Sequence, residues 1–190
     1  MRTAAAATLV ALLTATPAIS DEFTAALQAF YENEIADMAS NETLVSAVAA
    51  QNVETMSYTL DQIEALDQAW RAEVGSQSTP TITPVLENAT ADVLRDQVDA
   101  FGGRITEIFV MDAQGLNVAA SAVTSDFWQG DEAKHSETYG VGAGAVHISD
   151  IELDESTQRY QGQISFPVLD PASGEPIGAI TVGVDAQSLM

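Results

Sequence analysis

The chain has 190 residues, of which 28 are acidic and 6 are basic, and its formal net charge is −22. So negative a protein repels nucleic acid and anionic membrane surfaces, which excludes both as expected partners. The chain has no cysteine, which excludes disulfide bonds and a lipid-anchored lipoprotein. The charge can attract cationic ligands, although solubility in a salty habitat is the simpler account of it.

The first twenty residues have the pattern of a secretory signal peptide. A positive Arg2 precedes an apolar run of about ten residues, 4–13, whereas a stable membrane span takes roughly 20. Small side chains at Ala18 and Ser20 predict cleavage before Asp21. No later segment is long and apolar enough to span a membrane, so we expect a mature protein released into the periplasm.

Apolar residues recur at helical spacing through the first part of the chain, residues 21–104. The pattern predicts a first helix over about 21–39 and a second one that follows a cap at Ser40 or Asn41. A third helix should run from Thr59 or Asp61 to Val74, and a fourth from Pro84 or Ala91 to Phe101. The helix that follows residue 41 should be short, and 75–84 should be a loop because it is rich in Ser, Thr and Pro. Gly102 and Gly103 are a fitting stop for the last helix.

The remaining part, residues 105–190, alternates apolar runs with turns. It predicts five strands, over 105–112, 116–123, 145–153 with a bend near Ser149, 159–169 and 176–185. The first turn runs from Asp112 to Gly115, whose glycine can take a positive φ. Antiparallel strands joined by short turns and preceded by helices indicate an α+β fold, with both parts in a single domain.

Three segments resemble the extracellular Cache-type, or PDC, sensor domains. The hairpin 105–121 carries an Asp-x-x-Gly turn, the segment 126–132 lies where that family has its ligand-capping loop, and 174–185 has the form Gly-x-x-Ile-Gly-x-Ile-x-Val-Gly. The resemblance implies a PAS-like five-stranded antiparallel sheet with helices packed on it. It also implies that a small ligand binds between the sheet and the loop that follows the second strand.

The loop 125–139 supplies the candidate ligand-binding residues. They are Asp126, Trp128, Asp131, Glu132 and Tyr139. Aromatic faces and carboxylates suit an ammonium group, through cation–π attraction and ion pairing. The loop has no arginine to clamp a ligand carboxylate, which favours an amine over an amino acid. The alternative is that Phe127 and Trp128 only pin the loop to the core.

These patterns predict a non-catalytic, periplasmic ligand-binding domain of sensor type. It would present a small polar solute to a membrane receptor or histidine kinase, with no cofactor. Catalytic residues and a metal site are not expected. Asp131 and His135 lie one helical turn apart, but two such ligands alone do not make a metal-dependent enzyme.

A second alternative is an interaction module that binds no ligand. In that case the first helix would pair with its copy in a homodimer, and Phe23, Leu27 and Phe30 would lie partly exposed in the monomer.

Overall fold

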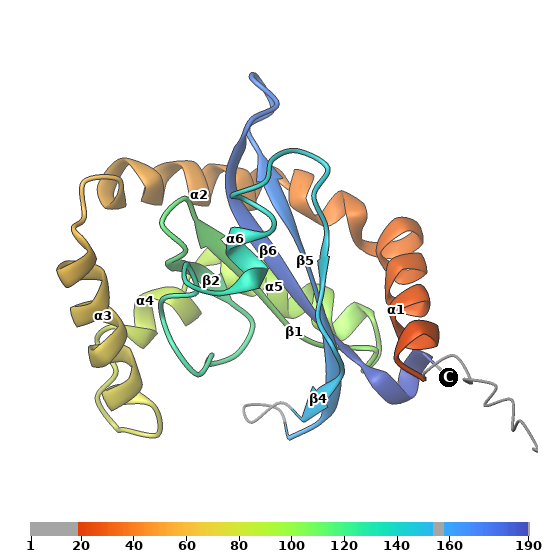
Figure 1. The fold of residues 1–190 in the computed structure, drawn as a ribbon. Coiled ribbons are helices and arrows are strands. Elements are labelled where there is room, and N and C mark those ends of the chain that lie inside the picture. Colours follow the sequence, from red (N-terminus) through yellow and green to blue (C-terminus); the bar gives the residue numbers. More distant parts are fainter. Residues whose placement is uncertain (1–18, 154–157, 190) are drawn as a thin grey trace, which may run out of the picture.

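The computed structural model of the protein describes residues 19–153 and 158–189, so the predicted leader, apart from its last two residues, lies outside the described part. The helices are α1 (Ile19–Phe30), α2 (Glu42–Thr55), α3 (Leu60–Glu73), α4 (Ile82–Leu86), α5 (Ala89–Ala100) and α6 (Ala133–Ser136) (Figure 1). The strands are β1 (Ile105–Asp112), β2 (Asn117–Ala120), β3 (His147–Ile148), β4 (Glu152–Leu153), β5 (Tyr160–Leu169) and β6 (Pro176–Asp185). None of the described helices is both long and apolar enough to cross a membrane.

Side-chain caps set where three of the helices begin. The Asn41 side chain accepts from the Thr43 and Leu44 amides before α2, Thr59 forms a capping box with Gln62 before α3, and Asn88 accepts from Ala91 before α5. Each cap satisfies backbone donors that have no partner within the helix. The helix after Asn41 runs for 14 residues, so the expectation of a short helix there was wrong.

Two elements differ from the expected helices. The segment predicted as one helix to residue 39 leaves α-helical winding after Phe30 and continues as a π turn (Tyr31–Ile35) and a 3-10 turn (Ala36–Ser40). The wide turn accommodates the five-residue step from Phe30 to Ile35, so that both side chains are buried. Within the expected loop 75–84, α4 begins at Ile82, because the Glu73 carboxylate accepts from the Thr81 and Ile82 amides.

Among the described residues, one antiparallel sheet has the strand order β2-β1-β6-β5-β3, and β4 also pairs with β5. The α+β prediction is confirmed. All five predicted strands are present, and the third is divided into β3 and β4 at the expected bend. Ser149 makes this bend: its amide donates to Gln163 O, and its hydroxyl accepts from Gln163 N while donating to Asp150 O.

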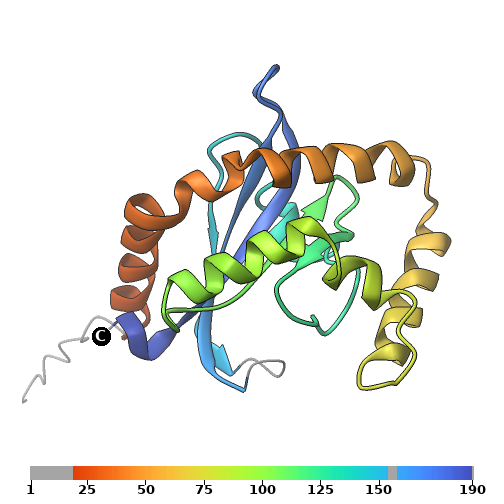
Figure 2. The same ribbon diagram turned by 180° about the vertical axis from the view of Figure 1, so that it is seen from behind.

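One face of the sheet is apolar and fully covered. α2 and α5 pack on it (Figure 2), and α1 adds side chains at its edge, over alternate residues of the three central strands: Ile108, Val110, Ile164, Phe166, Val168, Ile180, Val182 and Val184. Leu27 and Phe30 lie in this core with exposed fractions of 1% and 5%. The partly exposed stripe that a dimerising first helix requires is therefore not present at these two positions.

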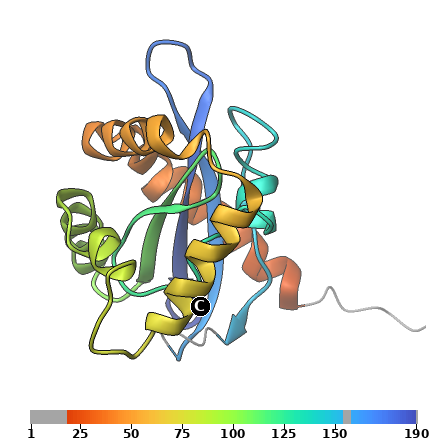
Figure 3. The ribbon, with the colours of Figure 1, turned by 90° about the vertical axis from the view of Figure 1, so that its left-hand side faces the viewer.

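The opposite face is divided between an apolar and a polar half. At the β1–β2 end, Phe109 and Met111 pack against Ile63 and Trp70 of α3, together with Phe127. Figure 3 shows the sheet nearly edge-on, with α2 and α5 on one side and α6 on the other. At the β5–β6 end this second face carries polar side chains, and the loop that contains α6 covers them.

The β1–β2 turn lies at the junction of helix, sheet and loop. The buried Asp112 carboxylate accepts from Gln51 and Thr55 of α2 and from the amides of Gln114 and Leu116. Gly115 has φ +82°, and a Cβ there would overlap the backbone of Gly130 in the loop. The turn and the loop can therefore touch only because both positions are glycine.

We expect Gly115→Ala to lower the free energy of unfolding by more than Gly174→Ala, as measured by urea denaturation. Gly174 has a similar φ of +74° with open space around it, so alanine there adds only backbone strain, roughly 1–2 kcal/mol. At Gly115 the overlap with Gly130 adds at least about 1 kcal/mol more. Equal losses in the two variants would show that the turn and the loop do not press together.

Candidate ligand-binding site

A pocket of about 400 Å³ lies between the polar half of the sheet and the loop 124–134. Pockets of this size hold small molecules. Its lining comes from β1 and β5 below, from the loop and α6 on one side, and from β3 and β4 on the other: Glu107, Phe109, Thr124, Ser125, Gln129, Glu132, Ala133, Lys134, His147, Ser149, Asp150, Glu152, Leu153, Gln161 and Gln163.

The floor of this pocket is a buried carboxylate held by two amides. Glu107 is 4% exposed and Gln161 3%. Glu107 Oε1 accepts from Gln161 Nε2 at 2.8 Å and from Gln163 Nε2 at 3.3 Å. Gly183 lies opposite Glu107 on β6, where a Cβ would come within 2.9 Å of Glu107 Cγ. The absence of a side chain at Gly183 therefore provides the space that Glu107 and Gln161 occupy.

One wall carries the single cation of the loop. Lys134 Nζ lies 3.1 Å from Glu132 Oε2 and donates to Gln129 Oε1 at 3.0 Å. It also lies 5.4 Å from the centroid of the Phe109 ring, over the pocket floor. The ammonium of Lys134 is thus already engaged by groups of the protein.

The opposite wall is acidic at its rim. Asp150 and Glu152 line the pocket there, and His147 pairs with Glu137 through an Nδ1–Oε2 distance of 3.0 Å. With Glu107 and Glu132, the lining within the described part of the chain has four carboxylates against one lysine and one histidine. The potential inside therefore favours a positively charged group.

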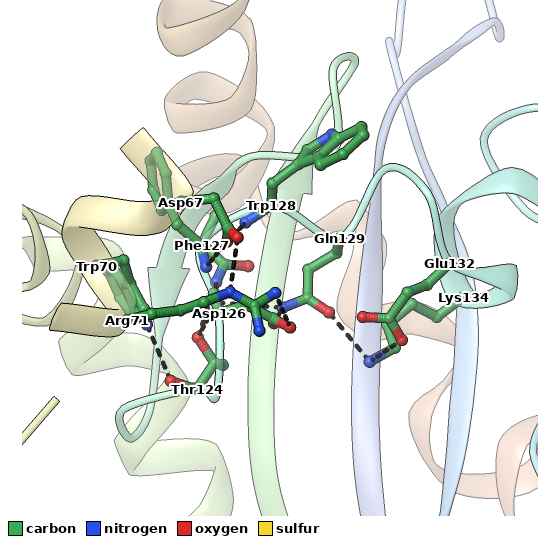
Figure 4. A network of polar contacts seen from close by, with 11 residues as sticks. Asp67, Trp70, Arg71, Thr124, Asp126, Phe127, Trp128, Gln129, Glu132 and Lys134 are labelled. Carbon is green, nitrogen blue, oxygen red and sulfur yellow. Dashed lines mark hydrogen bonds and ion pairs between the residues drawn. The ribbon is translucent and has the colours of Figure 1, made fainter. Parts of the chain in front are cut away.

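Helix α3 holds the loop in place (Figure 4). The carboxylate of Asp67 accepts from the amides of Phe127 and Trp128 at 2.9 and 3.0 Å. Trp70 Nε1 donates to Thr124 O at 2.9 Å, and its ring stacks on Phe127 at a centroid distance of 5.4 Å. These contacts satisfy backbone groups that belong to no regular strand or helix.

Asp126 is buried next to the pocket but faces α3. Its Oδ2 lies 3.1 Å from Arg71 Nη2, and its Oδ1 accepts from Gln129 Nε2. Burial raises the pKa of the Asp126 carboxyl, and the negative charge of Glu132 raises it further, while Arg71 and Lys134 act in the opposite direction. The ionised form of Asp126 therefore depends on its two cations.

The five residues predicted from the sequence occupy different places. Glu132 lines the pocket, whereas Asp126 faces Arg71 and Asp131 is exposed. The Trp128 indole donates to Gln114 O at 2.9 Å, and Tyr139 stacks on His135 at a centroid distance of 5.0 Å. Trp128 and Phe127 thus make the contacts expected of residues that pin the loop to the core.

Sequence reasoning missed the pocket floor, Glu107, Gln161 and Gln163. A signal for it was available, since Gln161, Gln163 and Ser165 are polar at every second position of a strand whose intervening residues are apolar or glycine. Side chains two apart point to one face of a strand. That face had to be covered by something polar or by a ligand.

His135 is the remaining titratable group of α6. It is buried, and its Nε2 lies 3.1 Å from Asp112 O. Asp131, its suggested partner for a metal, is exposed, and no group of three possible metal ligands occurs within residues 19–153 and 158–189. Burial lowers the pKa of His135 from the ordinary value of 6.5, so the folded protein favours the neutral ring.

No protein-family model and no curated protein sequence matches this chain. Among solved structures it is similar to the sensor domain of the histidine kinase DctB from V. cholerae, with 18% identity and a TM-score of 0.49 over 89% of this chain and 54% of that one. The ligand-binding domain of the Campylobacter jejuni chemoreceptor Tlp3, in complex with 4-methylisoleucine, matches with 11% identity and a TM-score of 0.44, over 90% of this chain and 63% of that one. The E. coli DcuS sensor domain matches with 12% identity and a TM-score of 0.40, over 68% of this chain and 90% of that one.

By their names, these neighbours are the sensor domain of a histidine kinase, the ligand-binding domain of a chemoreceptor and a further sensor domain. The chain spans between half and two thirds of the length of the DctB and Tlp3 structures. At this level of similarity they say nothing about the ligand of this chain, which has to be argued from the pocket.

We expect the protein to lose stability as the pH falls from about 7.5 to 5.5, because the unfolded chain takes up a proton at His135 before the folded chain does. The contribution of neutral His135 is present above its unfolded pKa of 6.5 and is lost as the pH falls through the lower folded pKa. In His135→Gln the loss of melting temperature over this range should shrink. The control is His147→Gln, which removes the other histidine and should leave this loss of melting temperature as it is. An unchanged loss in His135→Gln would contradict the role given to His135.

Proposed function

We propose that this protein is a small-molecule-binding domain of sensor type that captures a small organic amine in the pocket under the loop 124–134. The observation that carries the proposal is the buried polar floor of this pocket. Glu107 and Gln161 are nearly inaccessible, yet they lie on β1 and β5, strands whose other face is mostly apolar. Burying a carboxylate has a free-energy cost that packing alone does not require, so a binding role accounts for it.

The charges of the pocket support an amine as the ligand. An ammonium group can approach Glu107 from the cavity and find the rim carboxylates of Asp150 and Glu152 around it, while Phe109 offers an aromatic face. No arginine belongs to the described lining, and the Lys134 ammonium is engaged by Glu132 and Gln129. The charge of Lys134 is thus largely neutralised, and the carboxylates of the described lining would repel a ligand carboxylate, which favours an amine over an amino acid.

The side chains of the pocket support binding without catalysis. The Ser149 hydroxyl is held by the backbone of Asp150 and Gln163, and His147 is paired with Glu137. A nucleophile needs a base within hydrogen-bond reach. The Ser149 hydroxyl donates its proton to Asp150 O and not to His147.

The place of action and the partner are part of the same proposal. The leader-like pattern of residues 1–20 supports secretion to the periplasm. There the protein would present its ligand to a membrane receptor or a histidine kinase, with the loop and α3 as the surface that changes on binding.

A thermal-shift screen of the purified protein against amines such as putrescine, amino acids and short carboxylates tests this proposal. An amine should raise the melting temperature with dose, by mass action on the folded state. Glu107→Gln should weaken its binding roughly tenfold or more in calorimetry, because a hydrogen bond between charged groups is lost.

The matched control is Glu175→Gln, the same change of charge at an exposed position outside the pocket. It should leave the affinity unchanged. Stabilisation by carboxylates alone, or equal losses in the two variants, would contradict an amine held by Glu107.

A further inference from the structure

A continuous chain of polar contacts leads from the pocket to α3 (Figure 4). At the pocket end, Lys134 Nζ donates to Gln129 Oε1 at 3.0 Å. Gln129 Nε2 donates to Asp126 Oδ1, and Asp126 Oδ2 lies 3.1 Å from Arg71 Nη2. Arg71 Nε donates to Asp67 Oδ2 at 2.7 Å. The chain Lys134–Gln129–Asp126–Arg71–Asp67 thus alternates donors and acceptors without a gap.

The middle of this chain is shielded from water. Gln129 is 1% exposed, and both Asp126 and Asp67 are buried. Gln129 Oε1 accepts from Lys134, and Gln129 Nε2 donates to Asp126. A movement of Lys134 therefore also changes how the amide group is aligned on Asp126. In such surroundings a lost contact cannot be replaced by solvent, which makes neighbouring contacts depend on one another.

Asp67 links this chain to the backbone of the loop. One oxygen accepts from Arg71, and the other accepts from the amides of Phe127 and Trp128. Arg71 is half exposed at the outer surface of α3, yet it joins Asp67 to Asp126 across the gap between helix and loop. Neither Asp67 nor Arg71 lines the pocket.

We propose that Asp67 and Arg71 are positioning residues for the ligand site, and that the chain from Lys134 to Asp67 couples occupancy of the pocket to α3. The ligand in this inference is that of the proposed function, but the coupling is a property of the protein that exists without a ligand. An ammonium group that approaches Glu132 repels Lys134 and competes with it for the carboxylate. Lys134 then changes its contact with Gln129, and the change passes to Asp126 and Arg71.

Linkage makes the coupling reciprocal. If the ligand alters the equilibrium by which α3 holds the loop, then the held and released forms must differ in affinity for the ligand by the same factor. Substitutions along such chains change coupling by amounts that correspond to about two- to tenfold in an equilibrium constant.

The first test needs no ligand. Hydrogen exchange followed by mass spectrometry on the full chain compares Lys134→Met with Arg95→Met, which removes a cation on α5 outside the chain of contacts. We expect exchange of the α3 peptide, residues 60–73, to speed up about two- to tenfold in Lys134→Met alone. Unchanged exchange of α3 in Lys134→Met would overturn the coupling, whatever the ligand is.

The second test uses putrescine as the probe. Arg71→Gln should weaken its binding about two- to tenfold in calorimetry, whereas Arg95→Gln should not. In Trp128→Phe, Trp70 on α3 becomes the sole tryptophan, and its emission should change on saturation with putrescine because its ring stacks on Phe127 in the loop.

The outcomes separate the two proposals. Binding of putrescine with an unchanged Trp70 signal and an unchanged affinity in Arg71→Gln would overturn the coupling and leave the proposed function standing. If neither putrescine nor any other amine of the screen binds, the proposed function fails, and the hydrogen-exchange comparison alone decides the coupling.

Discussion

The buried carboxylate of Asp67 is the contact on which the site depends. The loop that follows β2 passes over the sheet without regular structure until α6, so its backbone amides need partners from elsewhere. Asp67 supplies them at Phe127 and Trp128, and the turn at Gly115 accepts from Gln129 N at 2.8 Å. With the loop held at these points, the polar half of the sheet is covered but not filled, and the pocket is the space that remains.

One face of the sheet forms most of the apolar core, and the other face carries the floor of the pocket. The first face is packed by α1, α2 and α5 with mostly apolar side chains, which provides the larger part of the core. The other face gives up part of its apolar area to Glu107, Gln161 and Gln163. The apolar burial of the first face and of the cluster around Trp70 offsets this cost.

The acidity of the chain acts at two ranges. The net charge of −22 produces a long-range field that salt screens strongly. The carboxylates of the pocket act at contact distance in partly dehydrated surroundings, where an ion pair is screened much less. An amine would be attracted by the first and selected by the second, and Lys134 provides the charge that a cationic ligand would displace.

The sequence by itself determined the features that are local. Apolar runs bounded by turns placed β1 and β6 at their observed limits, and glycine marked the turn after Asp112 and the end of α5. The caps Asn41 and Thr59 were each one of two candidates in the sequence, beside Ser40 and Asp61, because a cap satisfies amides only two or three residues away. These signals also carried the α+β class.

Only the tertiary structure decided what depends on residues far apart in the chain. Glu73 starts α4 from a different helix, and the burial of both Phe30 and Ile35 explains the π turn. The loop pattern alone could not show that Glu132 faces the pocket while Trp128 packs on the turn, since Asp67 and Gly115 set the path of the loop. The pocket floor was equally hidden, because which face of β5 lies under the loop is fixed by packing across the sheet and not by the strand itself.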